Sequence, residues 1–152
     1  MNIFYTVNDK YVPQLAAGIT SICENNKKAD RICFFVASMG ITEDNKNKLK
    51  EMTEAYGDSE HTRTVEIIEI VDLKSKIGFD FDTNGWNEIV LARLLVDKLL
   101  PEDVEKVLYL DGDTICVGPL DELWNMDMDG KAIGGSIEPT ANRKRKEDLG
   151  LK

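Results

Sequence analysis

The chain has 152 residues, of which 42% are hydrophobic, and this is enough for one domain with a sizeable core. Its formal net charge of −9 argues against nucleic-acid binding, because phosphate backbones need clustered lysine and arginine. No segment approaches the ~20 apolar residues that a membrane-spanning helix needs, and the first residues lack the basic start of a signal peptide, so we expect a cytoplasmic protein.

Apolar runs alternate with helical patterns in the first half of the chain. Three runs have the length of strands: residues 3–7, 32–37 and 65–71. A helix is predicted over residues 12–24, because apolar residues recur there at helical spacing and Pro13 suits its first turn. A second helix is predicted to begin after Thr42, whose hydroxyl can cap the free N–H groups of a helix start.

The second half of the chain continues the alternation. Its predicted elements are a loop at 78–85, an apolar helix at 87–100, a strand at 107–110, a helical turn at 121–125 and a strand at 132–137. Pro101 is expected to end the apolar helix. Strands that alternate with helices predict an α/β fold with a Rossmann-like, mostly parallel sheet flanked by helices.

The cysteines and the single histidine show no metal-binding or disulfide pattern, and the one basic run indicates no binding site. Cys23, Cys33 and Cys116 are odd in number and irregularly spaced, which favours buried, reduced thiols. His61 lies in a polar stretch and is predicted to be a surface residue. The basic run at 143–146 is predicted to be a solvated loop or linker.

Two carboxylates separated by one glycine, Asp111-Gly112-Asp113, directly follow the predicted strand at 107–110. Asp-Gly is a favoured pair for a type I′ hairpin turn, although this strand lacks the alternation that most hairpin strands show. Phosphatases of the haloacid-dehalogenase type also end a strand in an Asp-x-Asp motif. Their threonine lies one residue further from the second aspartate than Thr114 does, and their motif opens the domain.

The third interpretation of these carboxylates is a divalent-metal site. Residues i and i+2 of an extended segment point the same way, so Asp111 and Asp113 can reach one ion, while Gly112 lets the chain turn and a ligand approach. A hard cation held by carboxylates and phosphates is a common way to bind a nucleotide diphosphate, and α/β sheets bind ligands at the carboxyl ends of their strands. On the local motif alone, the metal site and the hairpin turn both remain open.

Four stretches together resemble glycosyltransferase family 8, whose members are retaining enzymes with the GT-A fold. They are residues 3–12, 15–25, 92–101 and 107–124. The last stretch is the most specific, since Tyr-Leu-Asp-x-Asp is followed about ten residues later by Leu-x-x-Leu-Trp. The resemblance implies a nucleotide-sugar-binding GT-A domain over residues 1–138, then a basic loop or linker at 139–152 that leads to an acceptor-binding part missing from this chain.

The activity implied by the resemblance is transfer of a hexose, glucose or galactose, from a UDP-sugar to a hydroxyl of a saccharide or lipid-linked saccharide. The configuration at the anomeric carbon would be retained, and Mn²⁺ or Mg²⁺ would neutralise charge on the departing diphosphate. No catalytic nucleophile is identified in the sequence. A nucleotide-sugar-binding module that turns nothing over is the alternative.

The resemblance also implies a donor site made of Thr6, Asn8, Tyr11, Asp111, Gly112 and Asp113. Asp111 and Asp113 would bind the metal ion, with Asp111 also near the ribose, and Gly112 fills the variable position between them. Thr6 would contact uracil through its backbone, Asn8 would hydrogen-bond the edge of the base, and Tyr11 would stack on it. Stacking of a base on an aromatic ring is worth about 1–3 kcal/mol.

Several positions depart from the family pattern or have two interpretations. Asn8 stands where an aspartate is frequent, Lys10 where an asparagine is frequent, and Glu88 where relatives place a basic residue near the donor phosphates or sugar. Glu138 falls near a family acid that faces the sugars, or is a surface glutamate. Arg93 is predicted either to clamp the acidic loop by charge-assisted hydrogen bonds or to lie on a solvated helix face.

The family's third metal ligand is a histidine well downstream of the acidic pair. His61 lies upstream of the pair and does not correspond to it. We therefore expect the 152 residues to be the donor-binding half of such an enzyme.

Overall fold

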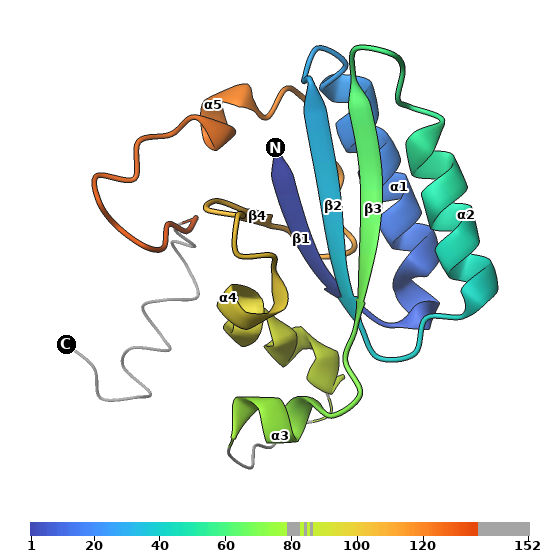
Figure 1. Cartoon of the computed structure of the whole chain (residues 1–152), viewed down its shortest axis with the longest axis vertical. Helices are drawn as coiled ribbons and strands as arrows, with labels where there is room; N and C mark the ends of the chain where they lie inside the picture. The colour runs from blue at the N-terminus through green and yellow to red at the C-terminus, as the bar shows by residue number, and fades with distance from the viewer. Residues whose placement is uncertain (79–82, 84, 86, 137–152) are drawn as a thin grey trace.

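The computed structural model of the chain describes residues 1–78, 83, 85 and 87–136. In this part, a parallel four-stranded sheet of order β3-β2-β1-β4 lies between two layers of helices (Figure 1). Its strands are β1 (Asn2–Val7), β2 (Arg31–Ser38), β3 (Thr62–Glu69) and β4 (Leu108–Tyr109). The predicted α/β class and parallel sheet are therefore confirmed.

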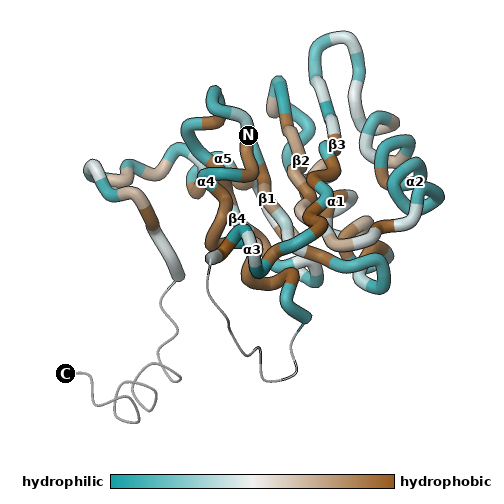
Figure 2. The backbone as a smooth tube through the Cα atoms, turned by 60° about the horizontal axis from the view of Figure 1, so that its bottom comes forward, coloured by the Kyte–Doolittle hydropathy of each residue, from teal (hydrophilic) through white to brown (hydrophobic). Residues whose placement is uncertain are grey.

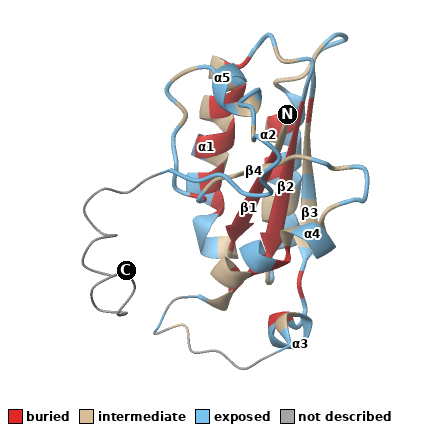
Figure 3. Cartoon of the chain, turned by 90° about the vertical axis from the view of Figure 1, so that its left-hand side faces the viewer, coloured by how far each residue is buried: buried red, intermediate tan, exposed pale blue. Residues whose placement is uncertain are grey.

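The two central strands, β1 and β2, are buried on both faces (Figure 3). Side chains alternate between the faces of a strand, so Ile3 and Tyr5 join one core while Phe4 joins the other. The same alternation puts Phe34 and Phe35 of β2 into opposite cores. This double burial explains why both strands are continuous apolar runs in the sequence.

Helices α1 (Val12–Asn25) and α2 (Glu43–Glu54) cover one face of the sheet (Figure 1). A single 3₁₀ turn, η1 (Asp9–Tyr11), joins β1 to α1. The hydroxyl of Thr42 accepts a hydrogen bond from the backbone N–H of Asn45, which confirms the predicted cap of α2. Helix α2 is largely hydrophilic (Figure 2) and buries only Leu49 and Thr53.

The other face of the sheet carries α3 (Leu73–Ile77), the 3₁₀ helix η2 (Glu88–Leu95) and α4 (Val96–Leu99). The sequence predicts one continuous α-helix over 87–100, and the structure replaces most of it with η2. The cap at Asn87 and the extended residue Leu100 before Pro101 bound the helical segment where the pattern indicates. Helix α3 falls outside the predicted elements, although Asp72 caps its start and Gly78 ends it in the left-handed region.

The last described segment contains one short helix, α5 (Asp121–Trp124), at the predicted place. The strand predicted at 132–137 is wrong for residues 132–136, which are exposed and have no strand assignment. A strand needs a neighbour to pair with, and none of the described strands pairs with this segment. Its final position, 137, lies outside the described residues.

The cysteines lie in or near the core. Cys23 and Cys33 are buried, Cys116 is half-buried, and all three are free thiols, as the spacing predicts. Among the described residues, no helix has the length and apolar character needed to cross a bilayer.

Candidate functional site

The strand order creates a switch point between β1 and β4. From β1 the chain crosses first to β2 and β3 on one side, and then returns to β4 on the other side. In open α/β sheets, ligands bind outside the carboxyl ends of the strands at such a point. The predicted site residues lie at this edge: Thr6 in the last part of β1, Asn8 and Tyr11 in the loop that follows it, and Asp111, Gly112 and Asp113 in the loop after β4.

Parallel pairing brings these two loops side by side. Phe4 of β1 pairs with Tyr109 of β4, and the N–H of Leu110 donates to the carbonyl of Phe4 at 3.1 Å. Two residues after Leu110, Gly112 packs directly on Val7, so that a Cβ atom at position 112 would lie 2.5 Å from Val7 Cγ1. The lack of a side chain at Gly112 therefore lets the acidic loop lie flat against the end of β1.

The carboxylate of Asp111 is held from one side. The hydroxyl of Tyr109 donates to Asp111 Oδ1 at 2.8 Å, and Arg93 Nη2 lies 3.6 Å from the same oxygen. The Arg93 guanidinium also lies over the Tyr109 ring, 4.5 Å from its centroid, and Thr6 Oγ1 lies 3.1 Å from the Tyr109 hydroxyl. Burial is the main reason that the pKa of Tyr109 is raised to about 12.

Arg93 differs from its sequence pattern. Its apolar neighbours suggest a buried residue, yet 40% of its side chain is exposed. η2 turns this side chain toward the acidic loop, and its Nε donates to the carbonyl of Val90 at 2.6 Å. Glu88 is the first residue of the same 3₁₀ helix and is half-buried.

The acidic loop is a turn that leads into irregular chain. The backbone N–H and the hydroxyl of Thr114 both donate to the carbonyl of Asp111, at 3.1 and 2.8 Å. Asp113 is exposed. No described residue after the loop forms a strand with β4, so the hairpin-turn interpretation is wrong.

The acidic loop contains two carboxylates that could bind a cation. Among the described residues, no group of three or more His, Cys, Asp or Glu side chains is arranged to hold a metal ion. Exposed carboxylate oxygens of Asp111 and Asp113 suit a hard cation such as Mg²⁺ or Mn²⁺, which commonly takes one or two carboxylates and completes its shell with phosphates and water. The donor set therefore fits a cation that arrives with a phosphorylated ligand.

The loop after β1 presents an aromatic ring and an amide. Asn8 Oδ1 accepts from the N–H of Lys10 at 3.0 Å, and the Asn8 carbonyl accepts from the N–H of Tyr11 at 3.0 Å. Tyr11 as a residue is 46% exposed. Asp9, by contrast, points to α2 and accepts from the backbone and hydroxyl of Thr42 and from Asn45 Nδ2. These bonds lower the pKa of Asp9 and fix the loop to the start of α2.

Sequence reasoning missed a set of polar residues, on the last turns of α1 and at its C-terminal cap, that fixes the chain after the acidic loop. Ser21 Oγ accepts from the N–H of Cys116 at 2.9 Å, Asn25 Nδ2 donates to the Cys116 carbonyl at 3.0 Å, and Asn26 Oδ1 accepts from the N–H of Leu120 at 2.7 Å. We call Ser21, Asn25 and Asn26 the α1 seam. The only sequence signal for it is the presence of polar residues beside the apolar stripe of α1.

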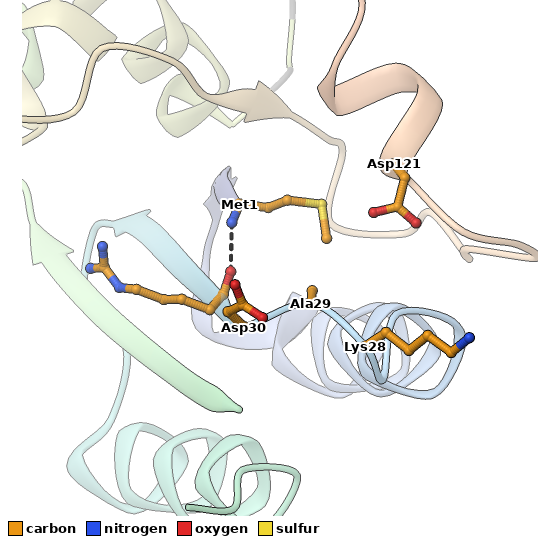
Figure 4. A pocket seen from close by; sticks show the side chains of 6 residues that line it. Met1, Lys28, Ala29, Asp30 and Asp121 are labelled. Carbon is orange, nitrogen blue, oxygen red and sulfur yellow. Dashed lines mark hydrogen bonds between the residues drawn. The ribbon is translucent and has the colours of Figure 1, made fainter. Parts of the chain in front are cut away.

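One further predicted residue, Glu138, lies outside the described residues. A pocket lined by Met1, Lys28, Ala29, Asp30, Arg31 and Asp121 lies at the opposite edge of the sheet, where β1 and β2 begin (Figure 4). The Met1 amine donates there to the carbonyl of Arg31 at 2.5 Å. The pocket is remote from the carboxyl ends of the strands and mixes acidic with basic side chains, so it does not extend the candidate site.

Comparison with known proteins shows the family of this chain. The sequence model of glycosyl transferase family 8 matches residues 2–149. The chain belongs to this family. The match favours a glycosyltransferase over the phosphatase alternative. It also agrees with the resemblance carried by the two loops of the candidate site.

Two similar proteins carry the name of a glycosyltransferase, and both are longer than this chain. A putative glycosyltransferase of Haemophilus influenzae is 27% identical over 163 residues, which cover 99% of this chain and 44% of that protein. A lipopolysaccharide 1,2-glucosyltransferase of Escherichia coli K12 is 23% identical, over 91% of this chain and 39% of the relative. The chain thus spans about half the length, or less, of these relatives.

The fold matches a solved glycosyltransferase structure. The galactosyltransferase LgtC, solved in complex with donor and acceptor sugar analogues, superposes with a TM-score of 0.80 and 25% identity. The match covers 100% of this chain and 52% of LgtC. This chain therefore has the GT-A fold that the family resemblance implies.

Proposed function

We propose that this chain binds a UDP-sugar at the carboxyl edge between β1 and β4, as part of a metal-dependent hexosyltransferase. The acceptor is a hydroxyl of a saccharide or a lipid-linked saccharide, and the transferred glucose or galactose retains its anomeric configuration. The observation that carries the proposal is the register of β1 and β4, which brings an exposed tyrosine loop next to a loop with two carboxylates.

The loop after β1 would hold the nucleoside. Tyr11 offers an exposed ring for stacking on uracil, and the backbone of Thr6 would contact the base. Asn8 Oδ1 already accepts one hydrogen bond from Lys10, but a carbonyl oxygen has two lone pairs and can accept a second bond from the uracil N–H. The departure from aspartate at position 8 is therefore compatible with uridine binding.

The loop after β4 would hold the diphosphate through a divalent cation. Asp111 and Asp113 would bind Mn²⁺ or Mg²⁺, which when bound neutralises charge on the leaving diphosphate. Arg93, beside Asp111, adds a positive charge at the same edge and would orient the acidic loop or the sugar. Without a cation, two carboxylates repel a diphosphate, so a chelator is expected to weaken donor binding strongly.

Calorimetry with UDP and Mn²⁺ tests the donor site directly. We expect UDP to bind when Mn²⁺ is present and to bind far more weakly after EDTA is added. A panel of UDP-sugars then identifies the hexose. UDP binding that is indifferent to EDTA would contradict the metal-bridged site.

The first testable substitution is Asp111→Asn, which keeps the shape of the side chain and removes its charge. Loss of a metal ligand is expected to weaken UDP binding in Mn²⁺ by roughly 100-fold or more, above the 10–100-fold typical of residues that only support ligands. Asp103→Asn is the matched control, because Asp103 is exposed on the turn before β4, at the other end of that strand. Parent-like UDP binding by Asp111→Asn would contradict the assignment.

A binding module without turnover is the second candidate. One observation favours it: the acidic loop offers two carboxylates, and the part of the chain that the structure describes holds no group of three or more side chains suited to a metal ion. Hydrolysis of UDP-sugar in Mn²⁺ discriminates between the candidates. Release of free hexose supports the enzyme, while tight binding without release supports the module.

A further inference from the structure

We propose that Tyr109 is a positioning residue that orients Asp111 for the metal ion. Its hydroxyl donates to Asp111 Oδ1, which also faces the Arg93 guanidinium, so that Oδ2 is the carboxylate oxygen without a described protein partner and is the one presented to the cation. This inference rests on the proposed metal-bridged donor site and names a residue that acts on it without binding the ligand itself.

The direction of the hydrogen bonds follows from the chemistry of the three groups. An ionised carboxylate only accepts, so the single proton of the Tyr109 hydroxyl is donated to Asp111 Oδ1 over 2.8 Å. The Thr6 hydroxyl lies 3.1 Å from the phenol oxygen, which has no proton left to give it. Thr6 must therefore be the donor, and the chain of bonds runs in one direction, from Thr6 through Tyr109 to Asp111.

The phenol is a rigid support for this carboxylate. Its backbone pairs with Phe4 in the sheet, and its ring packs 6.3 Å from the Phe4 ring, between centroids. The Arg93 guanidinium lies over the ring, 4.5 Å from its centroid. Thr6 is buried at the end of β1, so it fixes the phenol from the core side. The ring thus has neighbours that restrict both its translation and its rotation.

Asp111 itself lacks such support from packing, because 60% of its side chain is exposed. The bond from Tyr109 and the nearby charge of Arg93 both fall on Oδ1, and no described protein group bonds Oδ2. A carboxylate that is already oriented loses less rotational freedom when it binds a cation. Partners that orient a metal ligand typically change metal affinity by about 10–100-fold.

Tyr109→Phe isolates this role, because it keeps the ring and removes only the hydroxyl. In the presence of UDP, we expect the variant to bind Mn²⁺ at least roughly 10-fold more weakly than the parent does. The electron paramagnetic resonance signal of free Mn²⁺ measures this affinity. UDP affinity in EDTA should match that of the parent, whereas general damage to the edge of the sheet would weaken both. Tyr56→Phe, on the far side of the molecule at the end of α2, is the matched control and should leave both affinities unchanged.

The outcomes separate this inference from the proposed function. A parent protein that binds no Mn²⁺ with UDP would overturn the donor site and the inference with it. A parent that binds Mn²⁺, together with a Tyr109→Phe variant that binds it equally well, would overturn only the positioning role. If Tyr109→Phe does not fold, Thr6→Val gives a second test, since it removes the other support of the phenol and keeps the ring. Weaker Mn²⁺ binding is then expected, and parent-like binding would overturn the role.

Discussion

Val7 and Gly112 share one small volume beneath the acidic loop. Val7 is the last residue of β1 and is buried, and its Cγ1 lies 2.5 Å from where a Cβ atom at position 112 would be. A β-branched side chain in a strand has little rotamer freedom, so Val7 cannot turn away. The position of the two carboxylates therefore depends on the combined size of this pair, and a larger residue at either position should displace them.

Substitution of Gly112 tests this size relation. Gly112→Ala is expected to destabilise the protein by about 1–3 kcal/mol through overpacking and to weaken Mn²⁺-dependent UDP binding, because the loop must move away from β1. Val7→Ala in the same chain removes Cγ1 and should restore part of both losses. Urea unfolding and calorimetry on both single variants and the double variant give the coupling free energy, expected at about 0.5–3 kcal/mol. Strict additivity would contradict the contact.

At the scale of elements, α1 does more than cover the sheet. Its apolar stripe packs on β1 and β2, and the α1 seam bonds the backbone of the chain that follows the acidic loop. Gly18 on the same helix permits close approach, since a Cβ there would lie 2.9 Å from the carbonyl oxygen of Thr114. One helix thus fixes the exit of the acidic loop while the sheet fixes its entry.

Asn26 is the buried member of the seam and gives the clearest test of it. Its side chain accepts from the N–H of Leu120 at 2.7 Å and donates to the carbonyl of Ile22 at 2.9 Å. Asn26→Ala leaves the Leu120 N–H and the Ile22 carbonyl unpaired. Each of the two groups that water does not reach should then cost about 1–3 kcal/mol of stability. Asn47→Ala, exposed on α2, is the control and should lie within about 0.5 kcal/mol of the parent. Equal unfolding midpoints for the two variants would contradict the role of the seam.

The sequence predicts those elements whose signal is local. The strands at the centre of the sheet are recognisable because burial on both faces demands an unbroken apolar run, and the fold class follows from their alternation with helices. The difference between 3₁₀ and α geometry in η2 is not encoded in the apolar pattern, which suits both. The strand expected at 132–137 shows the limit, since an apolar run becomes a strand only where a partner strand lies beside it.

The candidate site is partly local and partly not. Asp111 and Asp113 are near neighbours in sequence, and the parallel pairing expected of an α/β sheet is enough to place them near the loop after β1. Tyr109 contacts Thr6, which lies about a hundred residues earlier in the chain. Arg93 lies near Asp111, about twenty residues further along. Only packing determines how close these elements come. The contact of Tyr109 with Thr6 carries no sequence signal of its own, whereas the approach of Arg93 to the acidic loop is one of the two positions that the sequence analysis considers for it.

At the scale of the whole molecule, acidic side chains dominate the charge, with a formal net value of −9. Several of them are stabilised as anions by local hydrogen bonds, and the pKa of each is lowered: Asp9, Glu24, Asp58 and Asp72. A carboxyl group whose pKa is lower in the folded state stabilises the fold above its unfolded pKa and loses this contribution as the pH falls through the folded pKa. Acid is therefore expected to destabilise the protein.

Asp58 gives the largest single test of this acid sensitivity. Hydrogen bonding to the His61 ring, 2.9 Å from Asp58 Oδ1, is the main cause that lowers the Asp58 pKa to about 2, and the backbone N–H groups of Glu60 and His61 add to it. As the pH falls from about 4 to about 2, the unfolded chain takes up a proton at this position before the folded chain does, so stability declines with decreasing pH. Asp58→Asn removes the titrating group. The slope of unfolding free energy against pH, which measures the protons taken up on unfolding, should then fall by an amount that corresponds to roughly one proton at most. Asp103→Asn is the control because Asp103 is exposed, and it should reproduce the parent slope. If Asp58→Asn also keeps the parent slope, the acid sensitivity comes from the other carboxylates, and the bond between Asp58 and His61 does not form in solution.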